Sequence, residues 1–113
     1  MRPILLAIPL LCAACTLAPP PVVPGRVLLS NPDIGPTEVE AVLTTSLDCT
    51  YRGPGFVSRQ LFVIPDNGTR FIEAPIGTDV CWRSIPVVQQ GAVHWSNWKL
   101  TYTYPGRSID SDL

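Results

Sequence analysis

Only one histidine, His94, occurs among the 113 residues of the sequence. A Ser-His-Asp site would have to use it, with Ser58, Ser84 or Ser96 as nucleophile. The Gly-x-Ser-x-Gly motif that exposes such a nucleophile does not occur. We therefore expect His94 to be an ordinary polar strand residue near a loop. We expect no catalytic residue, and a hydrolase is the remote alternative.

Closely spaced metal ligands and cofactor motifs are missing too. Zinc sites usually use paired ligands a few residues apart, whereas Cys49, Cys81 and His94 each stand alone. Asp110 and Asp112 lack the alternating ligands and glycine of a calcium loop. Neither a phosphate-binding glycine loop nor a dinucleotide fingerprint is found. The sequence therefore predicts no metal and no cofactor.

Charge is sparse and balanced, with 8 Lys and Arg against 9 Asp and Glu. The basic residues are spread singly along the chain, so neither nucleic acid nor an anionic lipid surface is an expected partner. Helical periodicity is also missing after Gly25. Together these absences disfavour a nucleic-acid-binding protein and a helical domain.

The most specific signal present lies in the first fifteen residues. A basic start at Arg2 precedes the apolar run Ile4–Leu11, and Cys12-Ala13-Ala14-Cys15 follows. This arrangement is typical of an export signal. Its end resembles the lipobox of bacterial lipoproteins, in which two small residues precede a cysteine that becomes the lipidated first residue. The resemblance implies that residues 1–15 are a lipoprotein signal segment and that Cys15 carries the lipid.

Other interpretations of this segment remain open. An ordinary signal cut after Ala14 or Ala18 would give a soluble exported protein. A transmembrane anchor needs roughly 20 apolar residues, far more than this run supplies. A redox Cys-x-x-Cys motif belongs at a helix start in a folded βαβ unit, so Cys12 and Cys15 in an apolar leader do not fit it.

Under the lipoprotein interpretation, Thr16 follows the lipidated cysteine. By resemblance to enterobacterial lipoproteins, this residue implies sorting to the outer membrane, with the domain facing the periplasm.

The next segment, residues 16–25, contains four prolines. Such a sequence favours polyproline II and predicts a semi-stiff tether of about 30 Å at most. Residues 26–113 then form one small domain, which is marginal without a cross-link. Cys49 and Cys81 are the cysteines left after the leader, and an exported compartment is oxidising, so we expect a disulfide between them.

Seven short strands punctuated by Gly and Pro predict an all-β domain, an antiparallel sandwich or small barrel. The expected strands are Arg26–Ser30, Thr37–Thr45, Val57–Ile64, Thr69–Ala74, Thr78–Ile85, Val93–Tyr104 and Arg107–Asp112.

Within Thr37–Thr45, alternation places Val39, Ala41 and Leu43 on one side of the strand. Glu38 and Glu40 on the other side are expected to face water. This segment is also a candidate edge strand that could recruit a partner by β-augmentation.

Local patterns predict how the later strands pair. Pro65-Asp66-Asn67-Gly68 is a hairpin signal, so Thr69–Ala74 should return beside Val57–Ile64. The C-terminal end of Val57–Ile64 is apolar on both faces and should be buried on both sides. Arg107–Asp112 could pair back after the Pro105-Gly106 turn.

These features favour a membrane-anchored, non-enzymatic envelope lipoprotein with a structural or partner-binding β domain and an envelope protein as its partner. The alternative is a module that binds a glycan or peptidoglycan through Trp82, Trp95 and Trp98, although aromatics of small β domains are mostly core. A lysozyme inhibitor is a special case, since some are small β-barrel lipoproteins. The Ser-Gly-containing inhibitory loop motif of those proteins is not found here.

Overall fold

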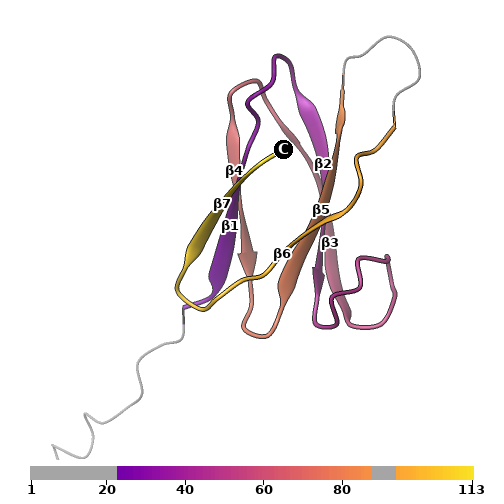
Figure 1. The fold of residues 1–113 in the computed structure, drawn as a ribbon, viewed down its shortest axis with the longest axis vertical. Coiled ribbons are helices and arrows are strands. Elements are labelled where there is room, and N and C mark those ends of the chain that lie inside the picture. The colour runs from indigo at the N-terminus through magenta and orange to yellow at the C-terminus, as the bar shows by residue number, and fades with distance from the viewer. Residues whose placement is uncertain (1–22, 88–93) are drawn as a thin grey trace, which may run out of the picture.

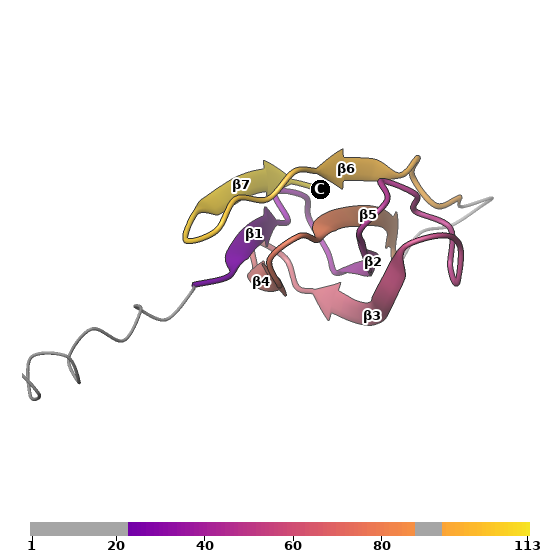
Figure 2. The ribbon, with the colours of Figure 1, turned by 90° about the horizontal axis from the view of Figure 1, so that it is seen from below.

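The computed structural model describes residues 23–87 and 94–113, and all the regular elements in these ranges are β-strands. Two sheets face each other (Figure 1, Figure 2). Three strands form one sheet in the order β4-β1-β7, with bounds Thr69–Ala74, Gly25–Ser30 and Ser108–Asp112. Four strands form the other in the order β3-β2-β5-β6, with bounds Phe56–Ile64, Thr37–Thr44, Asp79–Pro86 and Lys99–Thr101. The expected all-β sandwich is confirmed, and the barrel alternative is wrong because the two sheets do not close on each other.

The core lies between the sheets and follows the period-two pattern of the strands. Val39, Ala41 and Leu43 of β2 all belong to it, as the alternation predicts. The opposing sheet contributes Val27 and Leu29 from β1, both fully buried. Because adjacent residues of a strand point to opposite faces, each strand supplies one buried row and one outer row.

β2 is a central strand, so the expectation that Thr37–Thr45 is an edge was wrong. It pairs antiparallel with β3 on one side and with β5 on the other. Both rows of hydrogen-bonding groups along β2 are therefore occupied, and the strand cannot recruit a partner by β-augmentation. The edges of this sheet are β3 and the three-residue β6.

The Pro65–Gly68 turn is present, but it does not make a hairpin. Asn67 has a φ of 57°, and the Gly68 N–H donates to the Pro65 carbonyl at 2.8 Å. The strands on either side pair elsewhere, β3 with β2 and β4 with β1. The turn therefore carries the chain from one sheet to the other, and the Asn31 amide donates to the Ile64 and Pro65 carbonyls at its start.

The C-terminal half of β3 is buried on one face only, contrary to expectation. Phe62 and Ile64 lie in the core, whereas Leu61 and Val63 are each 50% exposed. The reason is that β3 is an edge strand whose outer row faces solvent. A half-exposed apolar row on an edge strand could not be inferred from composition alone.

The last two strands also differ from expectation. In the described part of Val93–Tyr104, only Lys99–Thr101 is strand. On either side of β6 the chain is held by side-chain hydrogen bonds: Ser96 bonds to the Ser84 backbone and Thr103 to Thr78 and Asp79. β7 does not pair back on β6; it joins β1 in the other sheet, and the pairing is parallel.

Across residues 23–87 and 94–113 there is no helix long and apolar enough to span a membrane.

Candidate functional site

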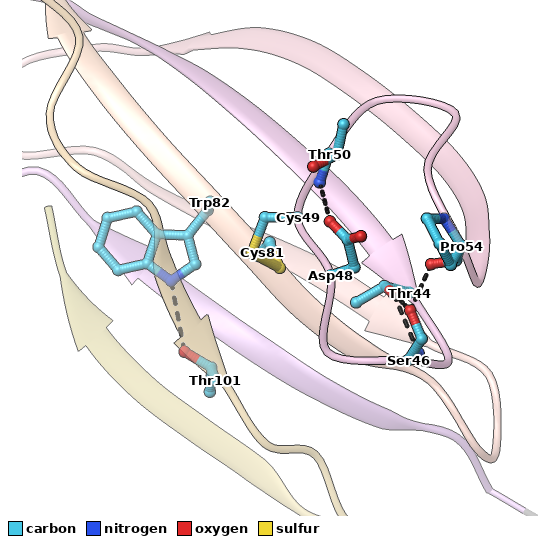
Figure 3. Close-up of a disulfide and its surroundings, with 9 residues drawn as sticks. All are labelled: Thr44, Ser46, Asp48, Cys49, Thr50, Pro54, Cys81, Trp82 and Thr101. Carbon is cyan, nitrogen blue, oxygen red and sulfur yellow. Dashed lines mark hydrogen bonds between the residues drawn. A yellow bond between two sulfur atoms is a disulfide. The ribbon is translucent and has the colours of Figure 1, made fainter.

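The disulfide between Cys49 and Cys81 is confirmed, with 5.5 Å between the two Cα atoms. It joins the loop after β2 to the middle of β5 on the outer face of the four-stranded sheet (Figure 3). Cys81 is fully buried. The same loop is closed by Ser46, whose hydroxyl donates to the Pro54 carbonyl, and by the Thr50 N–H, which donates to the Asp48 carboxylate at 2.8 Å. The bond therefore fixes a loop that covers part of this face.

Trp82 is a core residue, only 1% exposed. It follows Cys81 in β5, so it points to the opposite face, as Figure 3 shows. Its indole N–H donates to the Thr101 hydroxyl at 3.3 Å. A buried indole offers no surface to a ligand, so the expectation that Trp82 contacts a glycan was wrong.

The outer face of the four-stranded sheet holds a buried carboxylate. Glu40, on the central strand β2, has a side chain that is 4% exposed, which corrects the expectation that it faces water. Its Oε2 accepts from Arg59 Nε at 2.5 Å and its Oε1 from Arg83 Nε at 2.6 Å. Arg59 comes from β3 and Arg83 from β5, so the carboxylate bridges the strands on both sides of its own.

Aromatic rings flank both arginines. The Arg83 Cζ lies 4.9 Å from the Trp95 ring centroid and 4.6 Å from that of Trp98. The Arg59 Cζ lies 5.0 Å from the Tyr51 ring centroid. A guanidinium over an aromatic face is attracted by the ring quadrupole. We call the six residues the Glu40 cluster: Glu40, Tyr51, Arg59, Arg83, Trp95 and Trp98.

The Glu40 carboxylate stays charged inside this cluster. Burial alone would raise its pKa, but the hydrogen bonds and positive charges of Arg59 and Arg83 outweigh that effect and hold the pKa below its ordinary value of 4.5. With one carboxylate and two guanidiniums, the cluster carries a net charge of about +1 at neutral pH.

The cluster joins two of the three tryptophans singled out in the sequence with two arginines that the sequence analysis missed. Trp95 and Trp98 are partly exposed. A signal for the arginines existed: Arg59 and Arg83 both lie on strands with alternating patterns and share a face with Glu40. Local alternation does not show which strands are neighbours, so the three could not be placed together before the pairing was known.

The other expected site residues are not drawn together. His94 is exposed. Among residues 23–87 and 94–113, no three His, Cys, Asp or Glu side chains gather as metal ligands, and no pocket is found. The expected lipid acceptor Cys15, the expected leader and most of the expected tether lie outside the described residues.

A second surface feature is the end of the sandwich that holds the loop 31–36, which we call the distal pole. The described chain begins at Val23, at the opposite end (Figure 1). Ile34, in the distal loop, is 98% exposed. The base of this loop is fixed by Asn31, which is buried and whose amide donates to the Gly35 carbonyl at 3.0 Å. Near this pole the apolar side chains of Val63 and Val87 are also about half exposed.

Comparison of the chain with protein-family models, with curated proteins and with solved structures found no match. The fold and the geometry of its surfaces therefore carry the functional argument.

Proposed function

We propose that this protein is a small, non-enzymatic lipoprotein of a bacterial cell envelope whose β-sandwich binds another envelope component. The resemblance of Ala13-Ala14-Cys15 to a lipobox supports the lipid anchor, and Thr16 after the cysteine supports sorting to the outer membrane. The Pro-rich segment 16–25 supports a tether between the lipid and the domain.

The observation that carries the binding role is Ile34. Burying an isoleucine side chain stabilises a protein by roughly 1.5–3 kcal/mol, and here that side chain is 98% exposed. Asn31 anchors the base of the loop that carries Ile34 through hydrogen bonds to Gly35 and Ile64. An apolar side chain on an anchored loop loses less backbone freedom when it fills a pocket on a partner than one on a free loop does. We therefore assign the distal pole as the partner-binding surface.

A photo-cross-linking amino acid at position 34 in cells tests the proposal. The matched control is position 76, because Ile76 is also an exposed isoleucine in a turn, 55% exposed, but it follows β4 at the end where Val23 lies. We expect one discrete adduct from position 34 and none of that mass from position 76. Ile34→Arg should abolish recovery of that partner, and Ile76→Arg should leave it unchanged. Equal adducts from both positions, or unchanged recovery with Ile34→Arg, would overturn the assignment.

A further inference from the structure

The Glu40 cluster holds two guanidiniums whose hydrogen-bonding capacity is largely unused. An arginine carries five N–H donors in a planar fork. In Arg59 and Arg83 the Nε group is bonded to Glu40. No hydrogen bond joins the terminal nitrogens of either arginine to another residue of the described ranges, and the two side chains remain 35% and 31% exposed. Both forks therefore keep donors available at the surface of the sheet.

The two guanidiniums are also fixed in place before any ligand arrives. Glu40 pins each at Nε, the Tyr51 ring lies against Arg59, and the Trp95 and Trp98 rings lie against Arg83. Free arginine side chains lose considerable rotamer freedom when they bind, whereas these have already lost it on folding. The arrangement is therefore preorganised to bind a group that matches the fork.

The group that matches is an anion with paired oxygens. A guanidinium binds a carboxylate through two parallel N–H···O bonds, which are stronger than hydrogen bonds between neutral groups. Glu40 neutralises only one of the two positive charges, so the cluster still attracts an anion. Trp95 and Trp98 are partly exposed beside Arg83, and such rings offer an apolar face to a sugar ring.

From this geometry we infer that the outer face of the four-stranded sheet is a binding site for a carboxylated sugar. The carboxylate pairs with the terminal nitrogens of Arg83, with Arg59 adding charge from the other side of Glu40. The sugar ring lies against the exposed parts of Trp95 and Trp98. This site does not depend on Ile34 or the distal pole, so it stands apart from the proposed partner binding.

The test is a titration of the domain, residues 16–113 as a soluble chain with the disulfide intact, with N-acetylmuramic acid. N-acetylglucosamine, which lacks the lactyl carboxylate, and acetate, which lacks the ring, serve as the two matched probes. Binding is followed by the NMR shifts of the tryptophan indole N–H and arginine Nε–H groups. We expect a dissociation constant on the order of 1 mM for the carboxylated sugar. Both partial probes should bind at least tenfold more weakly.

Substitution of Arg83 distinguishes binding at the Glu40 cluster from nonspecific binding elsewhere on the domain. Arg83→Lys keeps the charge but removes the planar fork, and it should weaken binding at least tenfold. Arg26→Lys is the matched control, because the Arg26 Cζ also lies 4.6 Å from an aromatic centroid, that of Phe71, on the other sheet. Arg59→Lys is a second variant should Arg83→Lys fail to fold, which circular dichroism reveals.

Three outcomes would overturn the inference. The first is equal binding of N-acetylglucosamine, which would remove the role of the carboxylate. The second is equal binding of acetate, which would remove the role of the rings. The third is equal weakening by Arg26→Lys, which would show that binding does not depend on the Glu40 cluster. None of these results bears on cross-linking from position 34, so the two proposals fail separately.

Discussion

Glu40 shows how one buried charge can be accommodated on a sheet face. Removing a carboxylate from water costs several kcal/mol unless partners compensate. Here Arg59 and Arg83 satisfy one oxygen each, and both arginines remain about one third exposed, so they keep part of their own hydration. The desolvation cost therefore falls mainly on the Glu40 carboxylate, and its two hydrogen-bonded arginines favour its charged form in the folded state.

This arrangement predicts an acid-dependent stability. Because the pKa of Glu40 is lower in the folded state than the ordinary 4.5, the unfolded chain takes up a proton first as the pH falls. The stabilisation is fully present above about pH 5 and is lost as the pH drops through the folded pKa. Glu40→Gln should therefore lower the free energy of unfolding at pH 7 by about 2 kcal/mol and flatten its decline in acid.

Denaturant unfolding from pH 7 to pH 3 measures both effects. Glu38→Gln is the control, since Glu38 lies on the same face of β2 and forms no ion pair with any residue of 23–87 or 94–113. A Glu40→Gln variant with the parent's acid profile would contradict the account.

Asn31 is the second residue whose structural role was not predicted from the sequence. It is 1% exposed, its amide donates to the carbonyls of Gly35, Ile64 and Pro65, and its Oδ1 accepts from the Asp33 N–H. Asn31→Ala removes all four of these hydrogen bonds, including the buried one to the Ile64 carbonyl, and should cost about 2–4 kcal/mol. Asn31→Asp should cost at least as much, because a carboxylate would face carbonyl oxygens. Thermal unfolding measures both variants, and Asn97→Ala, at an exposed position, should change little. A loss below about 0.5 kcal/mol for Asn31→Ala would contradict this role.

At the scale of elements, strands were predictable from local pattern and their partners were not. The bounds of β4 match the expectation, and those of β1, β2, β3 and β5 differ by about one residue at an end. The alternation of β2 identified its core row. Pairing depends on contacts between segments far apart in the chain, and a strong turn such as Pro65–Gly68 can serve a hairpin or a crossover equally well. The Glu40 cluster could not be predicted for the same reason, because its charged residues come from three strands whose pairing was unknown.

The disulfide was predictable without knowledge of strand pairing. Cys49 and Cys81 are the cysteines left after the expected leader, and the expected compartment is oxidising. The bond closes a loop between residues 32 positions apart. In the chain-entropy model, such a loop contributes roughly 3.5–4 kcal/mol by restricting the unfolded chain. The Cys49→Ala, Cys81→Ala double variant should lose about that much free energy of unfolding, measured in urea. Reductant should produce the same loss in the parent and none in the variant. A thiol assay that finds both cysteines free in protein isolated from cells without reductant would contradict the prediction.

At the scale of the whole molecule, the proposed anchor would attach at the end of the sandwich opposite the distal pole. The described chain begins at Val23, at the end opposite Ile34 (Figure 1). A tether that enters there would place the distal pole, the proposed partner-binding surface, on the side away from the attachment. The proposed tether precedes β1, which begins at Gly25; in polyproline II, residues 16–24 would span about 28 Å and hold the domain clear of a membrane surface.

The anchor itself is tested by changing the acceptor. Cys15→Ser removes the thiol that the lipid requires, and the protein should move from the membrane fraction to the soluble fraction after cell lysis. A single acyl chain binds membranes only marginally, whereas several chains on one residue hold firmly, so the shift should be nearly complete. Cys12→Ser is the matched control, because Cys12 departs with the leader under this interpretation and its loss should leave the protein in the membrane fraction. If Cys15→Ser stays membrane-bound as firmly as the parent, the lipid proposal is wrong, and if Cys12→Ser alone releases the protein, the acceptor has been misassigned.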